Sequence, residues 1–269
     1  MITGRYQMCL ILFAHRCRSD LPLLLLANRD EYLARATAPA APWPEAAGIV
    51  AGRDLVGGGS WLGVAGDGRW AAVTNVREGE RTRPGGPSRG WLVRDYLLEG
   101  VPPAVFAARL ATRGHRYAGF NLLLGTPGEI WYVSNRQPAP VRLEPGFYGL
   151  SNGALDTPWP KVVQGKAALA ALSACSFPEV EAGFRLLADR TIHPDPHLPA
   201  TGIPLEWERA LSATFIVAPE RGYGTRCSTV LLHSAGGALL MAERSFAGTP
   251  AHWSQRSYRW TVGESSLDY

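Results

Sequence analysis

The feature that most limits the possible folds of this 269-residue chain is a series of short apolar segments bounded by Gly, Pro, Asn or Asp. This pattern is typical of β-strands joined by turns. Strands are predicted at 9–15, 23–28, 61–65, 69–75, 120–124, 130–134, 147–152, 214–218, 228–233 and 238–243. Pro127 and Gly128 predict a hairpin turn between the fifth and sixth of these strands.

Helical patterns are fewer and lie mostly between the two groups of strands. At 176–190 a capping-box spacing precedes an apolar helical face, and further helices are predicted at 101–114 and 161–173. The capping and apolar residues are Ser176, Glu179, Val180, Phe184 and Leu187. Prolines predict stiff loops at 39–44 and 194–199. The chain is therefore expected to be a layered α+β protein forming a single domain over 1–269.

The composition excludes several classes of function. Hydrophobic residues make up 46% and charged residues 19%, as in soluble globular proteins. The net charge is +4, and the arginines are scattered rather than clustered, which argues against nucleic-acid binding. The apolar runs are shorter than a membrane helix requires, and neither is followed by a signal-peptide cleavage site. A cytoplasmic protein without an integral membrane segment is predicted.

Cysteine and histidine spacing gives no metal signal. The four cysteines lie far apart without a C-x-x-C pair, which favours a reducing compartment over a zinc site or a disulfide scaffold. His193 and His197 are four apart, but the prolines between and after them disfavour the helix that a zinc pair would need. No metal ligands are predicted.

The glycine-rich stretch "VGGGSWLG" matches neither of the motifs that it suggests. A phosphate-binding loop needs Gly-Lys-Ser/Thr, and Ser60 and Trp61 follow the glycines instead. A hydrolase nucleophile elbow needs a second glycine where Leu62 stands. A tight turn leading into a strand at Trp61 is expected.

Polar residues gather where the predicted strands begin or end. Each alone is best interpreted as a turn or capping residue, but together they indicate a site presented by a sheet scaffold. The residues are Cys9, Asn28, Arg29, Asp30, Glu31, Asn75, Arg77, Ser151, Asn152, Thr225 and Arg226.

Cys9 follows Met8, so removal of the residues through Met8 would leave a cysteine with a free α-amine. That amine, with an ordinary pKa of about 8, could take the thiol proton. Arg29 and Arg226 would favour the reactive thiolate, and Asp30 could hold the ammonium or an arginine. Asn75 and Asn152 could donate to a developing oxyanion. Such a set could hydrolyse an amide.

The sequence also resembles a known family in successive blocks. These include "MCLILFAHR", "LLLANRDEYLARATAPAAPW", "SRGWLV", "YGLSNGALDTPWPKV" and "GYGTRCSTVLL". They are similar to the NRDE family, also called the transport and Golgi organisation 2 family, which takes its first name from residues 28–31. Family members normally begin Met-Cys, so residues 1–7 are expected to be an extension or to follow from a misassigned start.

The family in turn resembles N-terminal-nucleophile hydrolases, which implies a four-layer αββα sandwich of two antiparallel sheets. The resemblance implies catalytic roles for Cys9, Arg29, Asp30, Asn75, Asn152 and Arg226, with Glu31 an alternative to Asp30. Asn28, Glu31, Trp61 and Thr225 are the expected substrate-binding residues.

The resemblance leaves two functions open. One is a cytoplasmic N-terminal-cysteine hydrolase of a small amide or N-acyl compound, which needs no cofactor. The other is a non-catalytic carrier of haem, acyl-CoA or lipid, whose arginines would meet propionates or phosphates and whose tryptophans would line the pocket. The oligomeric state is left open.

Overall fold

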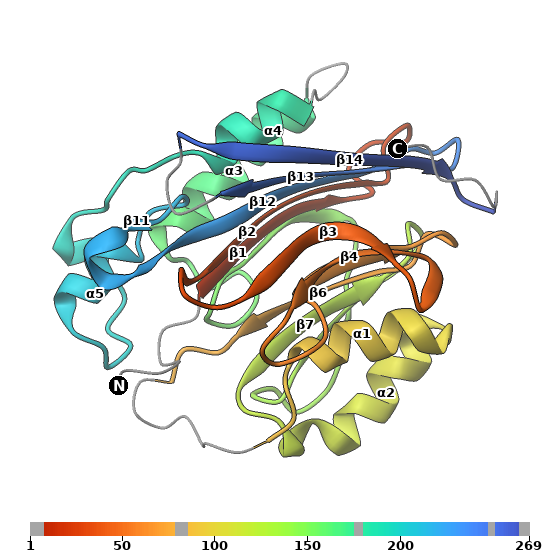
Figure 1. Ribbon diagram of the computed structural model, residues 1–269, viewed down its shortest axis with the longest axis horizontal. Coiled ribbons are helices and arrows are strands. Elements are labelled where there is room, and N and C mark those ends of the chain that lie inside the picture. Colours follow the sequence, from red (N-terminus) through yellow and green to blue (C-terminus); the bar gives the residue numbers. More distant parts are fainter. Residues whose placement is uncertain (1–7, 79–85, 175–179, 247–250, 264–269) are drawn as a thin grey trace.

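In a computed structural model, which describes residues 8–78, 86–174, 180–246 and 251–263, two antiparallel sheets stack face to face. Helices cover the outer face of each sheet, which gives four layers (Figure 1). The predicted α+β class and the αββα order of layers are therefore confirmed.

The first sheet, sheet A, has the order β10-β1-β2-β12-β13-β14, with β11 paired to β12. Its strands are β1 (Met8–His15), β2 (Leu23–Tyr32), β10 (Gly146–Leu150), β11 (Val217–Ala218), β12 (Tyr223–His233), β13 (Ala238–Phe246) and β14 (Trp253–Thr261). Strand β2 is buried along nearly its whole length, and its first half is apolar, because sheet B covers one face and helices cover the other.

Sheet B follows the chain in the order β3 to β9. Its strands are β3 (Thr37–Trp43), β4 (Ala46–Asp54), β5 (Leu62–Ala65), β6 (Trp70–Asn75), β7 (Phe120–Gly125), β8 (Ile130–Ser134) and β9 (Val141–Arg142). The predicted hairpin is confirmed as β7–β8. The stiff loop predicted at 39–44 is wrong over most of its length, because 39–43 belong to β3. Strand β3 is the edge of sheet B, where a proline without an N–H is tolerated.

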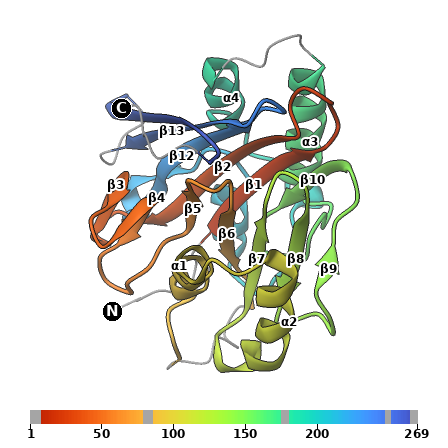
Figure 2. The ribbon, with the colours of Figure 1, turned by 90° about the vertical axis from the view of Figure 1, so that its right-hand side faces the viewer.

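Two helices cover each sheet (Figure 2). Helices α1 (Gly90–Glu99) and α2 (Pro103–Arg113) pack on sheet B, and α3 (Pro160–Ser173) and α4 (Val180–Leu187) pack on sheet A. A fifth helix, α5 (Leu205–Ala210), lies beyond the sheets, and short 3₁₀ turns occur at Gly114–Arg116, Asp195–His197 and Pro219–Arg221. The predicted capping-box residues Ser176 and Glu179 lie outside the described residues.

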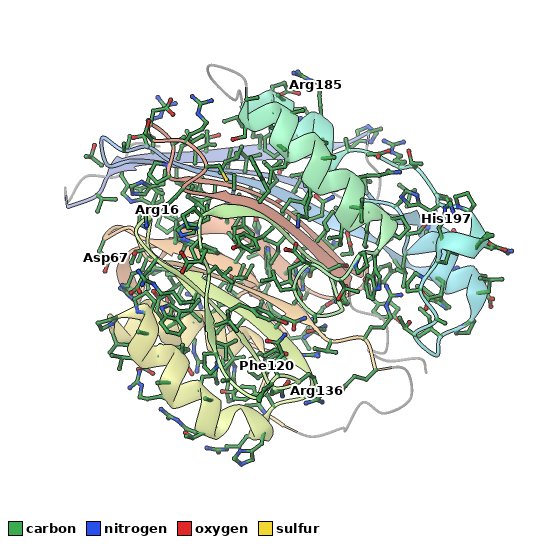
Figure 3. The ribbon with its side chains drawn as sticks, turned by 180° about the vertical axis from the view of Figure 1, so that it is seen from behind. Arg16, Asp67, Phe120, Arg136, Arg185 and His197 are labelled. Carbon is green, nitrogen blue, oxygen red and sulfur yellow. The ribbon has the colours of Figure 1, made fainter. Side chains whose placement is uncertain are left out.

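Three buried layers of side chains separate these four layers of backbone. The largest lies between the sheets, and the other two lie between each sheet and its helices. Figure 3 labels Phe120, which packs in the layer between sheet B and its helices. None of the helices in the described part of the chain is long and apolar enough to cross a membrane.

Candidate functional site

A cavity of about 490 Å³ opens where β1 begins and β2 ends. The residues that line it come from both sheets, from the turn between β4 and β5, and from the segment leading into α1. They are Cys9, Arg29, Asp30, Glu31, Arg35, Asp54, Gly57, Ser60, Trp61, Val73, Asn75, Gly86, Pro87, Ser88, Arg89, Gly90, Trp91 and Ala118. Six of the ten residues that were given catalytic or substrate-binding roles line it: Cys9, Arg29, Asp30, Glu31, Trp61 and Asn75.

Cys9 is fixed by backbone contacts at the start of β1. It lies opposite Arg29 in the β1–β2 ladder. Its backbone N–H donates to Asn152 Oδ1 at 3.2 Å, and its carbonyl accepts from Ser151 Oγ at 2.9 Å. The pKa of the Cys9 thiol is raised to about 12, mainly by burial and also by the negative charge of Asp30. The Arg29 guanidinium acts in the opposite direction and lowers it. With Met8 attached, the thiol is therefore protonated at neutral pH.

Arg29 extends from β2 toward sheet B. Its guanidinium lies 4.5 Å from the centre of the Trp61 ring, a stacking that stabilises both groups. Nη2 is 3.5 Å from Glu31 Oε2. The side chain is only 6% exposed, yet Nη1 has no hydrogen-bond partner within the described residues. A buried guanidinium N–H without an acceptor is a donor available to a ligand.

The glycine-rich turn, as expected, is tight and leads into β5. Asp54 organises it by accepting from the backbone N–H groups of Val56 and Gly57 at 3.0 and 3.1 Å. Gly59 has φ +89°, and a Cβ there would meet Gly90 O at 2.3 Å. The turn therefore sits directly against the start of α1, and it delivers Trp61 to the cavity wall.

The cavity also holds residues to which the sequence-based hypothesis gave no role, among them Arg35, Asp54, Arg89 and Trp91. Arg35 Nη2 pairs with Asp54 Oδ2 at 2.8 Å, and Trp91 Nε1 donates to Gly57 O at 2.9 Å. Burial lowers the pKa of Arg89 to about 10, and the nearby Cys9 and Glu31 charges oppose that shift. The "SRGWLV" block contains Arg89 and Trp91, so the signal was visible, but the motif alone gave no reason to place it beside Cys9.

Asn28 and Thr225 lie on the opposite face of sheet A, toward the helices. Asn28 Nδ2 donates to Leu187 O and Thr214 O at 2.9 and 2.8 Å, and Asn28 Oδ1 accepts from Ser228 Oγ at 2.6 Å. Through these bonds the Asn28 side chain joins β2 to β12, to the end of α4 and to the segment after α5. Neither Asn28 nor Thr225 is among the residues that line the large cavity.

Asp30 connects the two faces. Its Oδ1 accepts from Thr225 Oγ1 at 2.6 Å, while its backbone N–H bonds to the Cys9 sulfur. Burial raises the pKa of Asp30 to about 6, opposed mainly by the charge of Lys161. Lys161, in the first turn of α3, is 2% exposed, donates to Leu211 O at 3.0 Å, and has a pKa lowered by burial to about 8. Sequence reasoning missed this buried lysine because nothing in the pattern of α3 distinguishes it from a surface lysine.

Arg226 occupies a β-bulge between Thr225 and Cys227. Its Nη1 donates to the carbonyl groups of Tyr32, Leu33 and Arg35 at 3.0 to 3.1 Å. The guanidinium therefore holds the turn after β2 and is not among the groups that line the large cavity. The bulge redirects this side chain, which spacing alone did not reveal.

The two asparagines predicted as oxyanion donors are linked to each other. Asn152 Nδ2 donates to the backbone carbonyl of Asn75 at 2.7 Å, while Asn152 Oδ1 accepts from Cys9 N. Asn75 lines the cavity and Asn152 does not. Asn152 thus ties the start of β1 to the end of β6 beside the thiol. Within the described residues, no cluster of three His, Cys, Asp or Glu side chains is placed to hold a metal ion.

Fold and site together define a two-sheet αββα sandwich with a cysteine-centred cavity at one end. The chain belongs to the Transport and Golgi organisation 2 family, whose model matches residues 8–248. Transport and Golgi organization protein 2 homologs of Bos taurus and Homo sapiens are 34% and 32% identical to it, each over 95% of this chain and 99% of their own length. The Drosophila melanogaster protein is 30% identical over 91% of this chain and 94% of its own.

A solved structure of similar shape is the Caenorhabditis elegans ortholog of N-acylethanolamine-hydrolyzing acid amidase. It has a TM-score of 0.49 and 12% sequence identity, and the alignment covers 83% of this chain and 92% of that one.

Proposed function

We propose that this protein is a cysteine amidohydrolase that cleaves a small amide or N-acyl compound when Cys9 is its first residue. The observation that carries the proposal is the position of Cys9. Its thiol lies in a cavity with Arg29, and its backbone nitrogen is already held by Asn152 Oδ1 at 3.2 Å. Removing Met8 would turn that nitrogen into a free amine beside the thiol without moving it.

In the proposed reaction the α-amine takes the thiol proton, and sulfur attacks the carbonyl carbon of the amide. Asn75, which lines the cavity, would donate to the oxyanion that forms. The C–N bond then breaks, and the leaving amine takes the proton from the α-ammonium. Water, deprotonated by the same amine, attacks the thioester, which releases a carboxylic acid and returns the thiol.

The pKa of the thiol explains why processing would be required. With Met8 attached, the nitrogen of Cys9 is an amide that cannot accept a proton, and burial raises the pKa of the thiol to about 12. An adjacent α-ammonium would place a positive charge next to sulfur and would lower that pKa. The unprocessed chain should therefore be inactive.

The test compares the full chain with a chain started at Met8, with intact-mass spectrometry to establish which begins at Cys9. Both are assayed against a panel of N-acyl amides, with Cys9→Ser as the matched control. We expect turnover only from protein that begins at Cys9, and none from the serine variant. Equal turnover by Cys9→Ser would overturn the proposal.

The carrier function is the second candidate, and it needs no free α-amine on Cys9, so it applies where Met8 is retained. The indoles of Trp61 and Trp91 line the cavity beside the guanidinium groups, a surface suited to haem, acyl-CoA or a lipid. Haem titration followed by the Soret band tests this function. Arg29→Ala should weaken binding while Arg226→Ala should not, because Arg226 is engaged by the turn carbonyls. Equal binding by Arg29→Ala would count against the cavity as the haem site.

A further inference from the structure

A second and much smaller cavity lies beside Cys9, between the two sheets. Its volume is about 10 Å³, which is about the space that one water molecule or one methyl group needs. Both this cavity and the large one are lined by Cys9, Arg29, Trp61 and Val73, so the two spaces adjoin at the cysteine. We call the smaller space the inner pocket.

Small side chains on facing strands create the inner pocket. Along the face of β2 that meets sheet B, Leu25 is followed by Ala27, which lies opposite Ile11 in the β1–β2 ladder. Sheet B shows the same change on β6, where Ala72 follows Trp70 on the face toward sheet A. A larger side chain at either alanine position would fill the space. The hollow therefore follows from the choice of two alanines in an otherwise bulky layer.

The two spaces differ in the chemistry of their walls. Six of the ten described residues that line the inner pocket are apolar, namely Ile11, Ala27, Trp61, Leu62, Ala72 and Val73, and no carboxylate is among the ten. The wall of the large cavity includes charged side chains of both signs: Arg29, Asp30, Glu31, Arg35, Asp54 and Arg89. An apolar group of a ligand is therefore favoured in the inner pocket, and a polar group in the large cavity.

The core holds the walls of the inner pocket in place. Ile11 and Leu62 are 2% and 1% exposed, and both belong to the buried layer between the sheets. The Trp61 ring stacks with Arg29, and a Cβ at Gly52 would lie 2.1 Å from its Cη2 atom, so the indole rests directly on the backbone of β4. Close-packed side chains resist displacement, so a long chain would not enter the inner pocket.

We propose that the inner pocket binds the acyl side of the substrate and accepts a methyl-sized substituent, which makes the substrate an N-acetyl compound. The inference rests on the proposed function for Cys9 as the nucleophile. When sulfur attacks the acetyl carbon, the methyl group lies in the inner pocket and the amine portion extends into the large cavity. The C–N bond breaks, the amine leaves with the proton from the α-ammonium, and the acetyl group remains on sulfur as a thioester. The charged wall of the large cavity favours a polar amine portion.

Acylation of Cys9 by activated esters tests the inner pocket without requiring amide cleavage. Protein that begins at Cys9, as established by intact mass, is treated with p-nitrophenyl acetate or p-nitrophenyl hexanoate. Sulfur displaces p-nitrophenolate in both reactions, and the acyl group on Cys9 is measured by peptide mass spectrometry. The ratio of the two rates is divided by the same ratio for free cysteine, which removes the intrinsic difference between the esters.

We expect this acetate-to-hexanoate ratio to be about tenfold or more, because a hexanoyl chain exceeds the inner pocket. Leu62→Ala enlarges the pocket and should lower the ratio by about fivefold or more. Leu123→Ala is the matched control and should keep the parent ratio. Leu123 belongs to the same buried layer and lies opposite Ala72, but it does not line the pocket. Equal acylation by both esters, or a ratio unchanged in Leu62→Ala, would overturn the acyl subsite.

Ala27→Val makes the opposite change, because it fills the inner pocket. It should slow acetylation of Cys9 by about tenfold or more, since the methyl group then has no space beside the thiol. If Ala27→Val does not fold, Ala72→Val makes the same change from sheet B. Acetylation at the parent rate in the filled variant would overturn the subsite.

These outcomes are separable from the fate of the proposed hydrolase activity. A high ratio in protein that turns over no amide would keep the acyl subsite and discard the hydrolase. Equal turnover of the acetyl and hexanoyl amides of one amine would keep the hydrolase and discard the subsite.

Discussion

Residues 28–31 alternate between the two faces of strand β2. The polar side chains on one face make hydrogen bonds within the protein, and those on the other face line the cavity. On the helix side, Asn28 bonds to Leu187, Thr214 and Ser228, all within the protein. On the cavity side, Arg29 stacks on Trp61 and keeps a buried N–H without an acceptor among the described residues. A single tetrad thus supplies structural hydrogen bonds on one face and cavity-lining groups on the other.

Arg29→Met gives the largest expected effect on the cavity side. Removing the guanidinium should lower the rate of amide turnover by about 100-fold, as expected for the loss of one preorganised charged donor. Stability should fall as well, because the variant loses the stacking on Trp61 and leaves the buried Glu31 carboxylate without the Arg29 charge. Steady-state kinetics and urea unfolding of the same preparation measure the two quantities. A large loss of stability with unchanged turnover would mean that Arg29, on the cavity face, has a structural role and not a role in turnover.

Asn28→Ala is the corresponding change on the helix side. It should lower the free energy of unfolding by about 2 kcal/mol or more, because it leaves two buried carbonyls and the Ser228 hydroxyl without their partner. The rate at which iodoacetamide alkylates Cys9 should stay within about twofold of the parent. Faster or slower alkylation, with stability unchanged, would place Asn28 in the site.

Asp30 should make stability depend on pH. Burial raises its pKa from 3.8 to about 6 in the folded protein. Between these values the folded protein holds a proton that the unfolded chain has lost, so the contribution of Asp30 to stability falls as the pH rises. Asp30→Asn should remove that fall, which urea unfolding at several pH values would detect. An identical pH dependence in the variant would mean that Asp30 is not the titrating group.

Arg226→Met should have the smallest effect of the four. We expect a loss of about 1 kcal/mol in stability, because the half-buried guanidinium caps the carbonyl groups after β2. Thiol reactivity and turnover should be close to those of the parent, as measured by alkylation and steady-state kinetics. A loss of turnover similar to that of Arg29→Met would instead give Arg226 the catalytic role that the family resemblance implies.

The sequence predicted the layers better than the connections between them. Apolar runs bounded by Gly and Pro placed most strands of both sheets, because burial of those runs dominates the fold. Strands β3, β4, β9 and β14 and helices α1 and α5 were missed. Strand β3 holds Pro39 and Pro42, which predicted a loop, and β4 has only Ile49 and Val50 as large apolar residues. Strand β9 and helix α5 are short, β14 is largely exposed, and α1 has no capping side chain at its start.

For the site, the sequence correctly grouped Cys9 with Arg29. The start of β1 and the end of β2 are paired in an antiparallel ladder, so these two residues are neighbours in space. The sequence could not place Arg89 there, since that residue is brought to the cavity by the packing of α1 against a turn with two positive-φ glycines. The direction of Arg226 depends on a β-bulge, which leaves no clear sequence pattern.

The most direct test of the account is intact-mass spectrometry of protein beginning at Cys9, quenched during reaction with an activated ester of a small carboxylic acid. The account predicts a mass increase of one acyl group, located on Cys9 by peptide mapping, which decays as the carboxylic acid appears. The same reagent should leave Cys9→Ser and the chain that retains Met8 unmodified at this position. Acylation elsewhere, or none in protein that begins at Cys9, would contradict a catalytic cysteine in this cavity.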